Sequence, residues 1–210
     1  MRDDLSFIHR FVPAENPLEA KTLLLLHGTG GNEDDLLPLG HTLDPQANLL
    51  SPRGKVLENG MPRFFRRFAE GMFDVEDLKK RTHELAHFVQ EAADTYNFDP
   101  KRIIAVGYSN GANTAASMLL LHPDILAGAV LLRAMLPFEP ETMLKLKKKP
   151  VMILAGSDDA MMPRESTERL AEILRLAGAS VTLSWQQTGH RLTDLDKETA
   201  QNFLRTELVL

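Results

Sequence analysis

Ser109 lies in a segment whose residue types and spacing suit a nucleophile. Residues 107–111 read glycine, tyrosine, serine, asparagine, glycine, directly after the apolar run 103–106 and directly before the small-residue segment 112–121. A strand, a tight turn and a helix in this order predict an exposed nucleophilic serine. The glycines keep Cβ atoms out of the strained turn, and the helix N-terminus favours developing negative charge. The alternative is a glycine-rich turn with an incidental serine.

The serine needs a base, and the histidine comes last in this type of arrangement. Only His122 and His190 follow Ser109. His122 ends the helix predicted over 112–121, which at ~1.5 Å per residue puts it roughly 20 Å away. His190 follows the run 181–185, from which a loop can reach the carboxyl edge of a sheet. We therefore expect His190 to be the base, the alternative being a surface histidine.

Two adjacent carboxylates, Asp158 and Asp159, follow the apolar run 151–156. Loops at the carboxyl ends of parallel strands are where such sites form, so either aspartate could orient the histidine. Either could instead cap the helix predicted to begin near Pro163. The spacing alone leaves both aspartates as candidates.

A glycine-rich turn, 28–31, follows the apolar run 23–26 and could aim backbone N–H groups at an oxyanion. The expected pair of donors is one N–H from this turn and the N–H of Asn110, the residue after the nucleophile. The turn lacks both the Gly-Lys-Ser/Thr of a phosphate-binding loop and the spacing of a dinucleotide-binding fold. Nucleotide binding is therefore disfavoured.

Short apolar runs alternate with helical patterns along the chain. The runs lie at 23–26, 103–107, 129–132, 151–156 and 181–185, and the helical patterns at 74–96, 112–121, 165–176 and 192–208. Runs without polar alternation are typical of strands buried on both faces. The alternation predicts a mostly parallel sheet covered by helices, in one domain over residues 1–210.

Composition excludes several classes of protein. The 210 residues include 24 basic and 29 acidic side chains, a net charge of −5 that argues against nucleic-acid binding. The absence of cysteine excludes disulfides, thiolate metal sites and a cysteine nucleophile. His83 and His87 could form a metal pair on one helix, but surface histidines are favoured, and we expect no metal. No apolar run approaches ~20 residues and no signal peptide is evident, so we expect a cytoplasmic protein without membrane insertion.

Together these segments resemble α/β-hydrolases of the phospholipase/carboxylesterase family, which includes acyl-protein thioesterases. Within it, the chain is most similar to bacterial hydrolases linked to hydroquinone resistance. The resemblance covers essentially the whole chain and is carried by residues 23–33, 53–54, 58–65, 107–113 and 189–190. It implies a three-layer α/β fold with helices on both faces of the sheet and no large lid. It also implies a cofactor-free enzyme that often forms a homodimer.

The resemblance assigns roles to particular residues. The family's nucleophile falls on Ser109 and its histidine on His190. Its acid lies in a Gly-x-x-Asp-x-x-x-Pro pattern, which selects Asp159. Its first oxyanion donor follows a His-Gly pair, which selects the backbone of Thr29.

Two segments are candidates for contact with substrate. Residues 62–68 interleave arginine with phenylalanine, and the surrounding acidic residues oppose a nucleic-acid site. The phenylalanines could simply pack in the core while the arginines are solvated or paired. Alternatively, the segment lines the substrate mouth and selects an aromatic or anionic ester, with Phe65 and Arg67 as candidates. At 160–162 the chain has Ala-Met-Met where the family usually has proline and valines, which makes Met161 a third candidate.

The sequence thus predicts a serine carboxylesterase that hydrolyses small carboxylic esters through a Ser-His-Asp triad and an acyl-enzyme. A thioesterase or a lysophospholipase could use the same residues. A catalytically silent binding or sensor protein of the same fold is the alternative of another class. The intact order of serine, aspartate and histidine counts against it.

Overall fold

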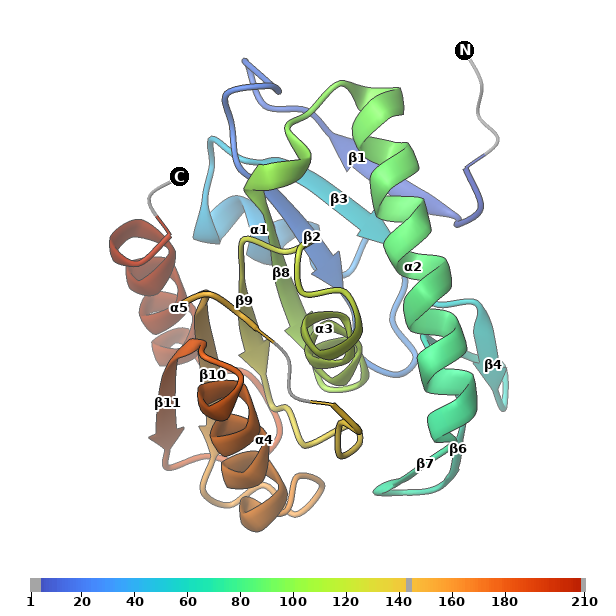
Figure 1. Cartoon of the computed structure of the whole chain (residues 1–210), viewed down its shortest axis with the longest axis vertical. Helices are drawn as coiled ribbons and strands as arrows, with labels where there is room; N and C mark the ends of the chain where they lie inside the picture. The colour runs from blue at the N-terminus through green and yellow to red at the C-terminus, as the bar shows by residue number, and fades with distance from the viewer. Residues whose placement is uncertain (1–4, 143–144, 209–210) are drawn as a thin grey trace.

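The computed structural model describes residues 5–142 and 145–208, and its centre is a seven-stranded sheet (Figure 1). The strands lie in the order β1-β3-β2-β8-β9-β10-β11, and every neighbouring pair is parallel except β1 with β3. Their bounds are β1 His9–Val12, β2 Thr22–Leu26, β3 Asn48–Pro52, β8 Ile103–Tyr108, β9 Gly128–Leu132, β10 Pro150–Gly156 and β11 Ser180–Gln186. The carboxyl ends of the parallel strands therefore meet at one edge.

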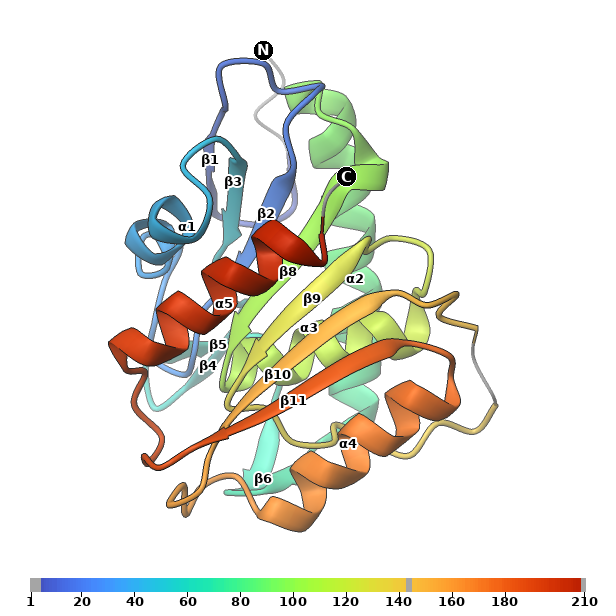
Figure 2. The ribbon, with the colours of Figure 1, turned by 90° about the vertical axis from the view of Figure 1, so that its left-hand side faces the viewer.

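Helices cover both faces of this sheet. They are α1 Leu37–Leu43, α2 Val75–Tyr96, α3 Asn110–Leu121, α4 Arg164–Leu176 and α5 Asp194–Thr206, with a short 3₁₀ turn at Pro100–Arg102. One core cluster contains the apolar faces of α2, α3 and α4, and the other contains those of α1 and α5. Figure 2 shows α5 in front of the strands, with α2 and α3 behind them. The predicted architecture, a mostly parallel sheet between two helical layers, is confirmed.

The buried leucines of β2 show why its sequence has no polar alternation. Leu24 and Leu26 pack into the cluster under α2 and α3, whereas Leu23 and Leu25 pack into the cluster under α1 and α5. Successive side chains of a strand point to opposite faces, and here both faces are covered. A continuous apolar run is the consequence.

The predicted helices are present with small changes at their ends. Asp74 caps α2, since its carboxylate accepts a hydrogen bond from the N–H of Asp77. Asn97 ends the helix in the left-handed region, with φ 55°. Helix α3 begins at Asn110, directly after the serine and earlier than the predicted 112–121.

Two β-hairpins lie between β3 and α2. Strands β4 Val56–Glu58 and β5 Met61–Arg63 form the first, and β6 Arg67–Ala69 and β7 Met72–Phe73 form the second. They contain most of the arginine- and phenylalanine-rich segment 62–68. Among the helices of the described residues, none has the length and apolar character needed to span a bilayer.

Candidate active site

Ser109 occupies a strained turn between β8 and α3. Its φ of 53° and ψ of −114° are unusual for a residue with a side chain. Its N–H donates to the carbonyl of Leu132 at 2.9 Å, which ties the turn to the neighbouring strand. A Cβ on Gly107 would contact the backbone of Gly111, and one on Gly111 would contact the backbone of Leu26. Both glycines are therefore required by close packing of backbone, as the sequence predicted.

His190 connects the serine to a carboxylate. The loop after β11 brings its Nε2 to 3.0 Å from Ser109 Oγ and its Nδ1 to 2.8 Å from Asp159 Oδ2. The Tyr108 hydroxyl donates to the His190 carbonyl at 3.1 Å, which fixes the backbone of the loop. His122 lies at the far end of α3, where its Nε2 is 2.8 Å from Nδ1 of His83.

The two neighbouring aspartates have different environments. Asp159 is 8% exposed, and its second oxygen, Oδ1, accepts the N–H of Met161 at 2.9 Å. Asp158 is exposed and accepts the hydroxyl of Ser157 at 3.2 Å. The structure brings Asp159, and not Asp158, to the histidine.

Two backbone N–H groups near the serine could donate hydrogen bonds to an oxyanion. Within the described residues, neither the N–H of Thr29 nor that of Asn110 has a hydrogen-bond partner. The Thr29 turn is held in place by two contacts: its hydroxyl accepts Nη1 of Arg63 at 2.8 Å, and the N–H of Gly30 donates to the carbonyl of Pro62 at 2.9 Å. The first hairpin therefore supports the glycine-rich turn.

A small cavity opens beside Ser109. It is lined by Thr29, Arg63, Arg67, Glu70, Gly71, Phe73, Ser109, Asn110, Asn113, Met135, Met161 and Met162. Two of the three predicted substrate-contacting residues, Arg67 and Met161, are in this lining. Phe65 is not, because its ring is fully buried in the core, edge-on to Phe73 at 5.1 Å between ring centres. Phe65 thus packs in the core, whereas Arg67 borders the cavity.

Arg63 is a site residue that the sequence analysis did not single out. Its side chain is 3% exposed, and its Nε lies 3.1 Å from Oε2 of Glu58. Burial lowers the pKa of Arg63, and the neighbouring charge of Arg67 acts in the same direction. Hydrogen bonds from Arg67 hold the pKa of Glu58 below its usual value. The position of Arg63 inside the motif of residues 58–65 is the sequence signal that could have identified it.

A second buried arginine was also missed. Arg133 directly follows β9, and its guanidinium donates to the carbonyls of Gly189, Arg191 and Leu154 at 3.0–3.2 Å. It also forms a two-pronged ion pair with Asp196 at 2.7 and 2.9 Å. Burial alone would raise the pKa of Asp196, but the hydrogen bonds from Arg133 and from Thr193 outweigh it and lower that pKa. The sequence signal that could have identified Arg133 is a charged residue directly after an apolar strand.

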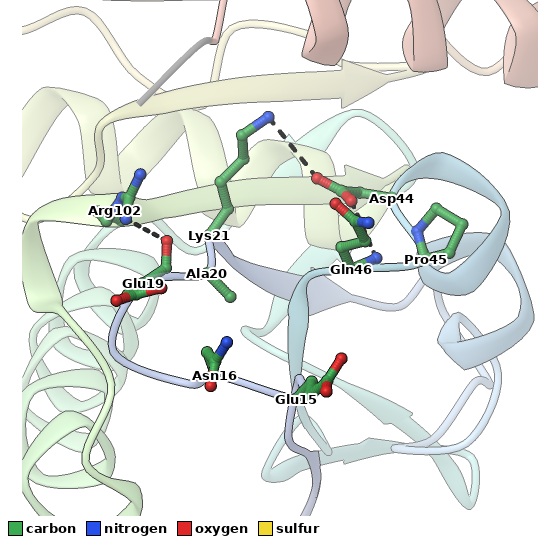
Figure 3. A pocket seen from close by; sticks show the side chains of 9 residues that line it. All are labelled: Glu15, Asn16, Glu19, Ala20, Lys21, Asp44, Pro45, Gln46 and Arg102. Carbon is green, nitrogen blue, oxygen red and sulfur yellow. Dashed lines mark hydrogen bonds and ion pairs between the residues drawn. The ribbon is translucent and has the colours of Figure 1, made fainter.

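A second cavity, of about 420 Å³, lies at the opposite ends of the strands and is wider than the cavity beside Ser109 (Figure 3). It is lined by Glu15, Asn16, Glu19, Ala20, Lys21, Asp44, Pro45, Gln46 and Arg102. Lys21 and Asp44 form an ion pair across it at 3.6 Å. It lies at the amino ends of β2 and β8, whereas sites in parallel sheets form at the carboxyl ends. Its described lining holds no nucleophile paired with a base.

The chain is similar to known hydrolases over most of its length. The sequence model of the phospholipase/carboxylesterase family matches residues 9–208. The MhqD protein of Bacillus subtilis (strain 168) is 51% identical over 187 residues, which are 89% of this chain and 94% of that protein. A carboxylesterase of Bacillus cereus is 48% identical with a TM-score of 0.93, covering 96% of this chain and 95% of its own. A carboxylesterase of Mesorhizobium loti is 30% identical with a TM-score of 0.90, covering 97% of each chain.

Proposed function

The chain belongs to the phospholipase/carboxylesterase family of hydrolases, and we propose that it is a serine carboxylesterase acting on small esters. The proposal assigns catalysis to Ser109, His190 and Asp159. One observation carries it: an unbroken chain of short contacts, 2.8 Å from Asp159 to His190 and 3.0 Å from His190 to Ser109. Serine hydrolases that catalyse acyl transfer have their nucleophile, base and orienting acid in this arrangement.

The first half of the reaction forms an acyl-enzyme. Ser109 Oγ attacks the acyl carbon of the ester while His190 Nε2 takes its proton. The carbonyl oxygen becomes an oxyanion and accepts hydrogen bonds from the N–H groups of Thr29 and Asn110. The intermediate collapses, the bond from carbon to the alcohol oxygen breaks, and His190 returns the proton to the departing alcohol. The acyl group remains on Ser109.

The second half releases the acid. Water attacks the acyl carbon while His190 again takes a proton, and the same two N–H groups hold the second oxyanion. The bond to Ser109 Oγ then breaks, and the proton goes back to the serine. The carboxylic acid leaves, and the enzyme is restored without a cofactor.

Asp159 sets the tautomer of the histidine. Its Oδ2 accepts from Nδ1, so the proton of a neutral His190 lies on that nitrogen and Nε2 is free to accept from Ser109. When His190 becomes an imidazolium, the buried carboxylate stabilises its charge. The N–H of Met161 holds the other oxygen and keeps the carboxylate in position.

The dimensions of the site favour short acyl chains. The cavity beside Ser109 measures about 30 Å³ and is walled by Phe73, Met135 and Met162. A thioester or a lysophospholipid could react at the same three residues. The small volume favours a short ester over the long chain of a lysophospholipid.

Two measurements test the proposal. A fluorophosphonate probe should label the wild-type protein and leave Ser109→Ala unlabelled. Nitrophenyl esters of graded length, assayed beside a thioester and a lysophospholipid, should show the highest kcat/KM for the short esters. Absence of both labelling and turnover would instead favour a silent binding protein of the same fold.

A further inference from the structure

An amide group beside the serine has a hydrogen-bonding capacity that the protein does not use. Asn110 is one of the residues that line the cavity, and the residue is 3% exposed. Its Oδ1 accepts the N–H of Phe64 at 2.8 Å, which fixes the orientation of the amide. Its Nδ2 is buried and has no partner among the described residues. A buried donor without an acceptor costs stability, so its presence calls for an explanation.

Arg63, which also lines this cavity, has a second unused donor. Its Nη1 donates to Thr29 at 2.8 Å, and its Nε donates to the carbonyl of Phe65 at 3.2 Å. Among the described residues, its Nη2 has no hydrogen-bond partner. The guanidinium is nevertheless more than nine-tenths buried. Near Ser109, the Nδ2 group of Asn110 and the cationic Nη2 group of Arg63 therefore both lack a hydrogen-bond acceptor among the described residues.

The charges around this part of the cavity do not balance. Glu58 is the carboxylate closest to Arg63, but it makes three hydrogen bonds of 2.8–3.1 Å to Arg67. Two guanidinium groups thus share one carboxylate, which leaves one positive charge in excess. Glu70 also borders the cavity, but its side chain is exposed, and water screens its charge.

We propose that the enzyme prefers esters that carry a free carboxylate near the scissile bond, and that Arg63 and Asn110 bind this carboxylate. A carboxylate supplies the acceptor oxygens that Nη2 and Nδ2 lack, and its negative charge balances the excess positive charge. The inference rests on the proposed function. The carboxylate can belong either to the acyl group, as in a monoester of a dicarboxylic acid, or to the alcohol.

Matched substrates separate these two sources. Nitrophenyl hemisuccinate is compared with nitrophenyl butyrate, and the acetate ester of hydroxybenzoate with phenyl acetate, each corrected for uncatalysed hydrolysis. We expect kcat/KM for the charged member of at least one pair to exceed that for the neutral member by about tenfold or more. Equal values in both pairs would overturn the inference, while turnover of the neutral esters would still support the proposed function.

The variants change this preference in opposite directions. Arg63→Met should lower the ratio of charged to neutral kcat/KM by about 10- to 100-fold, and Asn110→Ala by about 3- to 10-fold. Glu58→Gln removes the competing negative charge and should raise the ratio, a result that simple damage to the fold would not give. The matched control is Arg66→Met, because Arg66 is exposed and pairs with Asp74 outside the cavity. A preference that Arg63→Met leaves intact would show that the carboxylate binds elsewhere.

A binding measurement makes the test independent of turnover. In Ser109→Ala, calorimetry should show tighter binding of the charged ester than of its neutral partner, and Arg63→Met in that background should abolish the difference. Equal affinities of the two esters for Ser109→Ala would contradict the inference even if the wild type hydrolyses both.

Discussion

Arg133 holds the backbone on both sides of His190. Its guanidinium donates to the carbonyl of the preceding Gly189 at 3.1 Å and to that of the following Arg191 at 3.0 Å. The remaining N–H groups donate to Leu154 and Asp196, so all five donors of the side chain are used. Because Arg133 directly follows Leu132, whose carbonyl accepts the N–H of Ser109, it fixes the histidine loop relative to the nucleophile.

We predict that Arg133→Lys separates the two roles of this side chain. A lysine keeps the charge opposite Asp196 but cannot also reach the carbonyls of Gly189 and Arg191, since it lacks the planar fork. We expect most of the stability to remain, while kcat falls by about 10- to 100-fold with little change in KM, because the geometry of His190 is relaxed. Urea unfolding and steady-state kinetics on a neutral ester measure the two effects.

Arg133→Met is the companion variant. It leaves Asp196 buried without its cation, which should cost about 3–5 kcal/mol of unfolding free energy. A wild-type kcat in Arg133→Lys would show that the two carbonyl contacts do not position the histidine. A kcat in Arg133→Lys that recovers when the assay is cooled would point to instability instead.

We predict that the environment of His27 makes the folded protein less stable in mild acid. Its Nδ1 bonds to the Gly28 carbonyl at 2.6 Å, and its Nε2 accepts the N–H of Gly54 at 3.0 Å, an arrangement that requires a neutral ring. Burial lowers the pKa of His27 from the ordinary 6.5. Below pH 6.5, His27 therefore binds a proton in the unfolded chain but stays neutral in the folded chain. Folding is destabilised as pH falls through this window, by at most about 1.4 kcal/mol per pH unit.

His27→Gln checks this prediction, because a glutamine can still accept from Gly54 but does not titrate. Urea unfolding at pH 7.5 and at pH 5.5 should show a smaller difference in the variant than in the wild type. The pKa of His122 is also lowered by burial, but both proteins contain that histidine and its effect cancels. Identical pH dependence in the two proteins would mean that His27 is protonated without cost.

The apolar runs predicted the sheet because burial on both faces leaves a plain local signal. β3 gave no such signal, since Asn48 and Ser51 interrupt it. Asn48 is tolerated there because its side chain donates to Thr22 Oγ1 and to the carbonyl of Pro17, bonds that exist only after folding. The edge strand β1 has the same limitation: its antiparallel pairing with β3 depends on register, which no local pattern encodes.

Within the candidate triad, Ser109 and His190 could be predicted from local motifs, whereas Asp159 was selected from two adjacent aspartates by the resemblance to the family. The residues that support the triad could not be predicted. Ser109 and His190 stand in short patterns that the chemistry itself requires. Arg133 and Asp196 are far apart in sequence, and each alone resembles an ordinary surface charge. For Phe65 the alternation with arginine left open a core position and a place at the substrate mouth, and the ring packs into the core. Tertiary packing decided these positions.

Ser109→Ala should abolish ester turnover and leave the fold intact. The side chain caps no hydrogen bond of α3, so its loss removes the nucleophile without removing a structural contact of the helix. We expect kcat to fall by at least ~10⁴-fold. Ser157→Ala, an exposed serine near the site, is the control and should retain the wild-type rate. Turnover above a few per cent in purified Ser109→Ala, with an unchanged melting temperature, would remove Ser109 from the mechanism.

The adjacent aspartates provide the sharpest test of the proposed triad. Asp159→Asn keeps the shape of the side chain, but its amide donates where Nδ1 of His190 also donates, so the histidine is driven into the wrong tautomer. We predict that kcat falls by at least about 100-fold, equivalent to about 2.7 kcal/mol in the barrier. The loss can fall short of the ~10⁴-fold of serine proteases if the neighbouring carboxylate partly substitutes.

Asp158→Asn is the matched control, one residue away and with the same chemical change. Its carboxylate is exposed and contacts only the Ser157 hydroxyl among the hydrogen-bond partners in the described chain. Its loss should therefore reduce kcat by less than about tenfold, as for an ordinary surface substitution. The double variant, measured at the same pH, shows whether Asp158 rescues Asp159→Asn: a further fall beyond the two single effects means that it does. If Asp158→Asn is the more damaging single change, the carboxylate that orients His190 in solution is not Asp159.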